Sequence, residues 1–319
     1  MISLTKLRAL TLADAGSAPS HLSAASGLAC VGSSIYVVAD DELHLGIFPA
    51  ESDAPGRLLR LFPGSLPPEK DARKRQKPDL EAITVLPPFG RYTGGALLAF
   101  GSGSTPDRRL GALLAVDAQG SIAGSPQVID LSQLFSVLER HFPALNIEGA
   151  TTGGGTLRLL QRGNNRHPQN AIVRFSLAAL LDALSSGAPV GPLAPDAVDT
   201  VELGQIGGVP LCFTDGAALP DGGMVFTAIA EDTADTYNDG PCLGAAIGLA
   251  DKDGRICFVE HLDLPHKIEG VDARVDGDAI SLLLVTDADD AVVPACLFSA
   301  TIPNQRTHPN QRTCPYKGP

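Results

Sequence analysis

The chain has 319 residues and a formal net charge of −12, with 44% hydrophobic and 5% aromatic residues. Such a negative charge disfavours binding along a nucleic-acid backbone or adsorption to an anionic membrane, because both need a positive surface. It is compatible with a metal cation, or with a small ligand bridged to the protein by one.

The N-terminus, residues 1–6, lacks the apolar core of a signal peptide, and no apolar run reaches membrane-spanning length. A soluble, cytoplasmic protein is therefore expected. The six cysteines form no C-x-x-C pair and lie mostly in apolar runs, so we expect free thiols.

Five short segments share one pattern, in which a polar or acidic residue precedes a small residue and then mostly small or apolar ones. In chain order they are Ser26-Gly27-Leu28-Ala29, Glu81-Ala82-Ile83-Thr84, Glu148-Gly149-Ala150-Thr151, Asp215-Gly216-Ala217-Ala218 and Glu269-Gly270-Val271-Asp272. A turn and further strand-like runs follow each segment. A long repeat that carries several short strands predicts a β-propeller.

The runs after each segment supply the remaining strands of each blade. Second strands are expected at 35–39, 96–100, 157–161, 224–229 and 280–285, and third strands at 45–48, 112–116, 171–175, 244–249 and 296–300. Fourth strands are expected at 57–62, 127–131, 200–203 and 256–262. The count gives four complete blades and a fifth that lacks one strand.

Residues 7–12 alternate apolar and polar side chains and precede the first repeat, so they can supply the missing strand. The fold class predicted is therefore an all-β, five-bladed propeller closed by its N-terminal strand. A six-bladed ring would need another blade hidden in the long insertions. We expect one propeller domain over residues 1–303, a flexible tail over 304–319, and helical segments at 132–140 and 177–184.

The first strand of each blade lines the channel of a propeller, so the repeat starts should form a ring around its mouth. The predicted ring is Ser26, Glu81, Glu148, Asp215 and Glu269, with Thr214 as a substitute for Asp215. Carboxylates this close repel one another unless a cation or protons neutralise them. Oxygen ligands without histidine favour Ca²⁺. The alternative is that the ring only hydrogen-bonds backbone amides and water.

Charged loops follow the second strands and should share the face on which this ring opens. The cations that could hold an anionic group beside a bound metal ion are Arg108, Arg109, Arg162, Arg166 and Lys267. For any single arginine the alternative is a solvated loop charge, and Arg162 is favoured because the end of a second strand lies close to the axis. The basic run 69–77 is interpreted as a solvated or lid-like loop. The sequence has no G-x-S-x-G elbow, P-loop or dinucleotide fingerprint.

The segments Asp79-Leu80-Glu81-Ala82, Asn146-Ile147-Glu148-Gly149 and Lys267-Ile268-Glu269-Gly270 resemble the repeated first strands of one propeller group. This group includes the esterase-like-phytase domains, the SdiA-regulated proteins and the calcium-activated nucleotidases. The resemblance implies five blades and a central Ca²⁺ held by Ser26, Glu81, Glu148 and Glu269. Asp215 departs from it, since the nucleotidases have serine there.

These observations favour a Ca²⁺-dependent hydrolase of phosphoryl or carboxylic esters, acting at the channel mouth on a small anionic ligand. Glu81 and Arg162 are the candidate catalytic residues. The alternative is a non-catalytic propeller that binds a ligand or a protein and holds a structural axial Ca²⁺. A glycoside hydrolase would need aromatic sugar platforms, and the sequence has no tryptophan. The sequence does not indicate an oligomeric state.

Overall fold

Each of the five repeats forms a four-stranded antiparallel sheet in the computed structural model, which describes residues 1–13, 20–187, 189–234 and 240–304. Blade 1 consists of β2 (Ala25–Val31), β3 (Ser34–Ala39), β4 (His44–Pro49) and β5 (Arg57–Arg60). Blade 2 consists of β6 (Leu80–Leu86), β7 (Ala96–Gly101), β8 (Leu110–Ala115) and β9 (Gln127–Asp130). Blade 3 consists of β10 (Ile147–Gly153), β11 (Thr156–Gln161), β12 (Asn170–Ser176) and β13 (Ala197–Val201).

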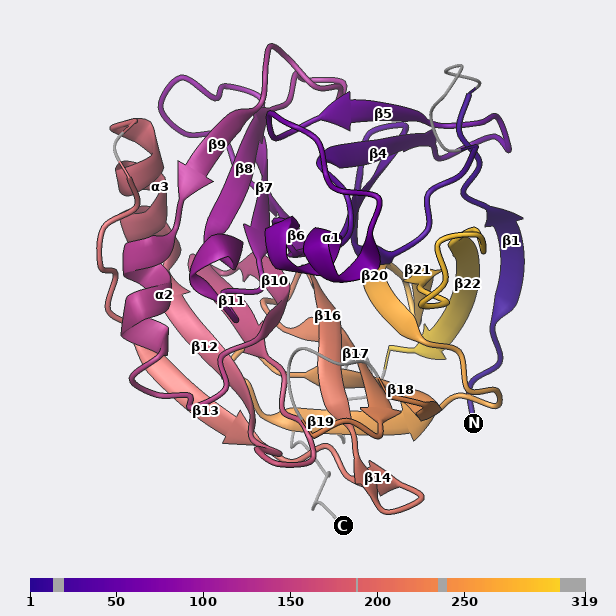
Figure 1. Ribbon diagram of the computed structural model, residues 1–319. Helices are drawn as coiled ribbons and strands as arrows, with labels where there is room; N and C mark the ends of the chain where they lie inside the picture. The colour runs from indigo at the N-terminus through magenta and orange to yellow at the C-terminus, as the bar shows by residue number, and fades with distance from the viewer. Residues whose placement is uncertain (14–19, 188, 235–239, 305–319) are drawn as a thin grey trace.

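The last two blades complete the ring (Figure 1). Blade 4 consists of β16 (Cys212–Ala218), β17 (Met224–Glu231), β18 (Cys242–Ala250) and β19 (Ile256–His261). Blade 5 consists of β20 (Ile268–Asp276), β21 (Ala279–Thr286), β22 (Cys296–Pro303) and the N-terminal β1 (Thr5–Ala9). The prediction of five blades is confirmed, and the six-bladed alternative is wrong.

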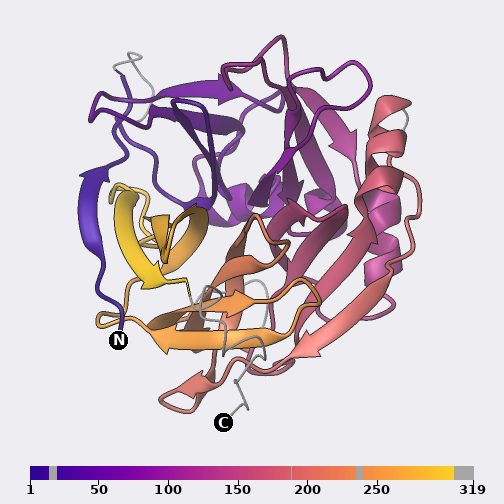
Figure 2. The same ribbon diagram turned by 180° about the vertical axis from the view of Figure 1, so that it is seen from behind.

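The N-terminal strand closes the ring as predicted. Strand β1 pairs antiparallel with β22, with Thr5 opposite Ser299 and Ala9 opposite Cys296 (Figure 2). Its Arg8 side chain donates a hydrogen bond across the closure to the carbonyl oxygen of Pro49 in blade 1, at 2.5 Å. The two ends of the ring are thus joined both within blade 5 and between blades 5 and 1.

The core consists of five apolar clusters, one at each interface between neighbouring blades. Alternating strand residues face each cluster, which is why the repeats were visible as short apolar runs. The helices α2 (Ser132–Leu138) and α3 (Leu177–Ser185) extend the cluster between blades 2 and 3 with leucines on one face.

Three shorter elements lie outside the blades. They are the helix α1 (Lys70–Gln76), the 3-10 helix η1 (Pro106–Arg108) and the small hairpin of β14 (Gln205–Ile206) with β15 (Val209–Pro210). Helix α1 crosses the centre of the ring in Figure 1 and falls within the run predicted as a loop. None of the helices in the described ranges has the length and hydrophobicity needed to cross a membrane.

The C-terminal end and the cysteines bear on two further expectations. Asn304 donates a hydrogen bond to the carbonyl oxygen of Gly277 at 3.1 Å, and residues 305–319 of the predicted tail lie outside the described residues. Cys30, Cys212, Cys242 and Cys296 are free thiols. Cys257 is disulfide-bonded, so the prediction of a free thiol is wrong there.

Candidate functional site

Every inner strand carries a β-bulge at its start. The pairing between first and second strands skips one residue in each blade, so that residue faces no partner on the ladder. The skipped residues are Ser26, Glu81, Glu148, Thr214 and Glu269. The repeat found in the sequence is therefore a repeated bulge, which turns one side chain per blade out of the regular alternation.

In four of the five blades the residue after the bulge is small, because neighbouring inner strands touch there. A Cβ atom on Gly27 would lie 2.9 Å from the backbone oxygen of Glu81, and one on Gly270 would lie 3.1 Å from the backbone of Gly27. Contacts that short force the backbones apart. This crowding explains the small residue that follows the polar one in the repeat.

Asp215 takes the small-residue position in blade 4, and Thr214 takes the bulge. The Asp215 carboxylate is fully buried and accepts a hydrogen bond from the backbone N–H of Val271 at 2.9 Å. Burial raises its pKa well above the usual range, although backbone amides, including that of Leu28, oppose the shift. Asp215 does not line the pocket described next, so the structure separates it from the other four predicted ligands.

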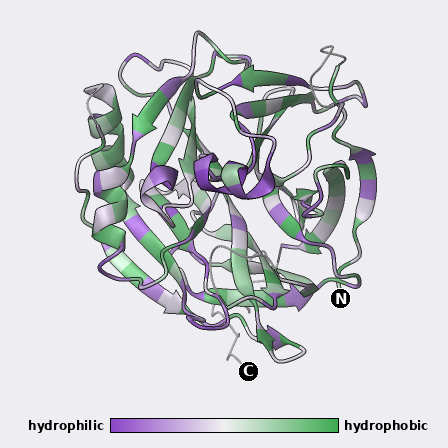
Figure 3. Cartoon of the chain, in the orientation of Figure 1, coloured by the Kyte–Doolittle hydropathy of each residue, from purple (hydrophilic) through white to green (hydrophobic). Residues whose placement is uncertain are grey.

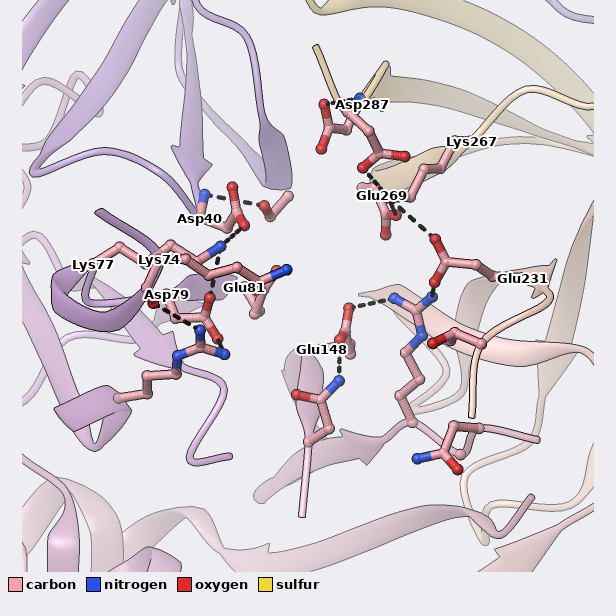
Figure 4. Close-up of a pocket in the computed structure, with 18 residues that line it drawn as sticks. Asp40, Lys74, Lys77, Asp79, Glu81, Glu148, Glu231, Lys267, Glu269 and Asp287 are labelled. Atoms are coloured by element: carbon pink, nitrogen blue, oxygen red, sulfur yellow. Dashed lines mark hydrogen bonds and ion pairs between the residues drawn. The ribbon is translucent and has the colours of Figure 1, made fainter. Parts of the chain in front are cut away.

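A charged pocket lies at the channel mouth, as Figure 4 shows. Its walls carry eight carboxylate residues and five cationic ones. The carboxylates are Asp40, Asp79, Glu81, Glu148, Glu231, Glu269, Asp287 and Asp289, and the cations are Lys74, Lys77, Arg108, Arg162 and Lys267. The excess of negative charge supports a cation as one occupant.

Three of these carboxylates are close enough to share a metal ion. Asp40, Asp79 and Glu81 each place a carboxylate oxygen within 4.8 Å of the other two. Asp40 directly follows strand β3 of blade 1, whereas Asp79 and Glu81 start blade 2. Burial, followed by repulsion from Glu148, Asp79 and Asp40, raises the pKa of Glu81 well above its ordinary value.

Asp79 is held in place by several groups at once. It has φ of 56°, a left-handed backbone conformation that aspartate tolerates better than most residues. Its carboxylate accepts from Ser102 Oγ at 2.6 Å and pairs with Arg108 Nη1 at 2.8 Å. The backbone turn thus aims the carboxylate between blades 1 and 2.

The ammonium group of Lys77 lies within the same carboxylate cluster. Its Nζ contacts Asp40 Oδ2 and lies 2.9 Å from Asp79 Oδ1. Burial lowers the pKa of Lys77, but the carboxylates of Asp40, Asp79 and Glu81 outweigh this effect and raise it overall. The chain therefore supplies a cation of its own at this point.

Arg162 lies across the pocket and joins two blades. Its Nη1 is 3.1 Å from Glu148 Oε2 in blade 3, and its Nη2 is 2.5 Å from Glu231 Oε2 in blade 4. Burial lowers the pKa of Arg162, whereas Glu148, Glu269 and Glu231 together raise it well above its usual value. The Arg162 side chain is thus only 11% exposed and lies between carboxylates, so it is not a solvated loop charge.

The remaining predicted ring residues also reach the pocket. Glu269 lies 3.5 Å from Lys267 Nζ, and burial raises the pKa of Glu269 to about 8. Ser26 is nearly buried, and its Oγ accepts from the backbone N–H of Asp40 at 3.2 Å. The structure therefore brings four of the predicted ligands to one pocket, namely Ser26, Glu81, Glu148 and Glu269. Of these four, only Glu81 belongs to the compact carboxylate group found among the described residues.

Sequence reasoning missed most of the residues that surround the ring. Asp79 was noted only within a resemblance, and no individual role was predicted for Asp40, Lys77 or Glu231. One signal was available, because Asp79, Asn146 and Lys267 each stand two residues before a bulge glutamate. Of the other predicted cations, Arg109 pairs with Glu139, and neither Arg109 nor Arg166 lines the pocket.

The donors fit a hard cation by their chemistry. All three are carboxylate oxygens, which Ca²⁺ and Mg²⁺ prefer, and neither histidine nor cysteine joins them. The irregular arrangement of carboxylates from two blades suits Ca²⁺, which tolerates flexible geometry. A cation bound there would have to replace the Lys77 ammonium.

Comparison with known proteins places the chain in a family without supplying an activity. A family model described as "Family of unknown function (DUF6929)" matches residues 21–302. No curated protein matches the chain. The chain is similar in fold to solved propellers at low identity.

Two of these structures illustrate the likeness. Glutaminyl cyclase from Myxococcus xanthus is 12% identical with a TM-score of 0.48, over 95% of this chain and 97% of that one. The WD40 β-propeller domain of Doa1 is 10% identical with a TM-score of 0.35, over 92% of this chain and 97% of that one. Likeness at this level concerns the fold alone.

Proposed function

Because the chain belongs to the DUF6929 family of unknown function, we propose from the site alone that it is a Ca²⁺-dependent hydrolase of phosphoryl or carboxylic esters. One observation carries the proposal: the Asp40–Asp79–Glu81 triad opens on the same pocket as the guanidinium groups of Arg108 and Arg162. The triad would hold the ion, and the cationic side chains would hold a small anionic substrate. Such a pairing of carboxylates with guanidinium groups suits a metal-bridged anion.

The chain's own residues divide the work of hydrolysis. Hydrolysis adds the hydroxyl of one water to the phosphoryl or acyl centre, and the leaving oxygen gains a proton. Burial and the neighbouring carboxylates raise the pKa of Glu81, which favours proton acceptance. We therefore assign Glu81 the transfer of the proton that the attacking water loses and the leaving oxygen gains. Arg162 orients the anionic group from the opposite wall. A bound Ca²⁺ would supply polarisation of the scissile group.

The experiment is an activity screen on 4-nitrophenyl phosphate and 4-nitrophenyl acetate, with Ca²⁺ and with a chelator. We expect turnover that needs Ca²⁺ and a loss of about 100-fold or more in kcat for Glu81→Gln, since general acid–base catalysis contributes roughly that much. Arg162→Ala should raise KM, and its folding must be checked because it leaves Glu148 and Glu231 without their shared partner. Calorimetry should show Ca²⁺ binding that Glu81→Gln weakens.

A second candidate is a non-catalytic binding propeller with a structural ion. It is favoured by the saturation of Arg162, whose guanidinium already pairs with two carboxylates of this chain. In that case Ca²⁺ raises the melting temperature by mass action, and neither ester is turned over. Tight Ca²⁺ binding without turnover of either ester would contradict the hydrolase proposal and favour this candidate.

A further inference from the structure

Helix α1 covers the channel mouth without any apolar anchor. None of its side chains is buried, and its surface is almost wholly hydrophilic in Figure 3. Two of the pocket's cations, Lys74 and Lys77, come from this helix and its C-terminal cap. The helix therefore forms part of the pocket wall, although it places no buried side chain in an apolar cluster.

Ion pairs and hydrogen bonds attach α1 to the two blades beneath it. Arg73 Nε lies 2.6 Å from Asp41 Oδ1, and Arg73 Nη2 lies 3.6 Å from Glu42 Oε1. Asp41 and Glu42 follow β3, the second strand of blade 1. Arg108 Nη2 donates to the backbone oxygen of Lys74 at 3.1 Å. A seven-residue helix is not stable alone, so these contacts keep it in place.

The contact that Lys77 makes also blocks the Asp40–Asp79–Glu81 triad. Lys77 is the C-cap of α1, and its ammonium lies between Asp40 and Asp79. These two carboxylates are also two of the three donors that could hold a metal ion. An ammonium group and a divalent cation cannot both occupy that space, because each needs the same carboxylate oxygens and each repels the other.

We propose that α1 is a lid latched by Lys77, and that Ca²⁺ opens it by taking the place of the Lys77 ammonium. This rests on the proposed Ca²⁺ site and adds its regulation. Once Lys77 is displaced, the helix loses its attachment to Asp40 and Asp79, and the pocket wall that carries Lys74 and Lys77 can move. By linkage, anything that weakens the closed lid must tighten Ca²⁺ binding by the same factor.

The test compares three variants of the full chain by calorimetry and by hydrogen exchange of residues 70–77. Lys77→Met removes the ammonium but keeps the apolar stem of the side chain. The variant should bind Ca²⁺ at least about fivefold more tightly, because coupling between two sites usually changes affinity by at least about that factor. Arg73→Gln touches no member of the triad, yet it should also tighten binding. Lys70→Met is the matched control, since Lys70 is an exposed lysine of the same helix, and it should change affinity little.

Hydrogen exchange provides a readout independent of activity. Ca²⁺ should speed exchange over residues 70–77 in the wild type, and Lys77→Met should show fast exchange already without Ca²⁺. The lid would be overturned, and the proposed function left standing, if Ca²⁺ bound without changing exchange over residues 70–77 and bound the wild type and Lys77→Met with equal affinity. Absence of Ca²⁺ binding in both the wild type and Lys77→Met would overturn both.

Discussion

At the scale of single residues, carboxyl groups whose pKa is raised by burial make the stability of this propeller depend on pH. Asp272 lies on β20, three residues after the bulge at Glu269, and faces Cys30 on β2. Burial raises the pKa of Asp272 to about 6, and hydrogen bonds from Cys30 only partly offset that effect. The folded chain thus keeps a proton that an unfolded chain loses near about pH 4.

The sign of the resulting pH dependence follows from that difference. A raised pKa in the folded state stabilises the protein fully below about pH 4, and this contribution is lost as pH rises to about 6. Asp272→Asn stays neutral throughout, so relative to the wild type it should gain about 2 kcal/mol of unfolding free energy between about pH 4 and pH 7. Urea unfolding at both pH values measures this gain. Asp278→Asn, on the exposed turn of the same hairpin, is the control, and an equal difference at both pH values would refute the assignment.

At the scale of elements, the repeated bulge matters more than any single strand. It delivers a polar side chain to the channel mouth, and the residue behind it permits close contact between inner strands. Gly27→Ala would place a methyl group 2.9 Å from the Glu81 backbone oxygen and 3.0 Å from Val38. We expect a loss of about 1–3 kcal/mol of stability, as in other overpacked cores, measured by chemical unfolding.

A matched glycine shows whether the contact or the loss of glycine is responsible. A Cβ atom added at Gly191 would meet no atom within 4 Å, so Gly191→Ala should change stability by less than about 0.5 kcal/mol. The position after the bulge is not closed to alanine in every blade, since blade 2 has Ala82 there. A neutral Gly27→Ala would mean that the inner strands relax apart at little cost.

The elements that were predictable from the sequence are those with their own local pattern. The strands carry alternating apolar residues, and the helices predicted at 132–140 and 177–184 match α2 and α3 closely, because each has leucines at helical spacing. Helix α1 carries no such apolar face, so periodicity could not reveal it. In blade 4 the sequence could not show which residue forms the bulge, because Thr214 and Asp215 are both polar. Only the pairing with β17 assigns the bulge to Thr214.

The candidate site was less predictable than the fold, because its members come together only through ring closure. Asp40 and Asp79 lie 39 positions apart in different blades, and Arg162 meets Glu231 across another blade interface. No local pattern marks such pairs. Four of the five predicted ring residues line the pocket because the repeat itself defines their position.

At the scale of the whole molecule, stability depends on closing the ring. The inner strands contact one another all round the channel, and the charged pocket is assembled from all five blades. Leu10, which follows β1, is fully buried in the cluster between blades 5 and 1, and its backbone N–H donates to Ala295 O at 2.8 Å. The N-terminal segment therefore belongs to the core at the interface where the ring closes.

Deletion of residues 1–12 should remove β1 together with Leu10, expose the edge of β22 and abolish cooperative unfolding. The reason is that β22 would lose its outer partner while the blade 5–blade 1 interface would lose Arg8 and its bond to Pro49.

A synthetic peptide of residues 1–12, added in trans, should restore a cooperative transition whose midpoint rises with peptide concentration, because it binds only the folded ring. A peptide with Leu10→Asp should fail, since it would bury a charge in the cluster that Leu10 fills. Calorimetric scans test all three, and a truncated chain that melts at the parental temperature would show that the other four blades hold the ring without its closing strand.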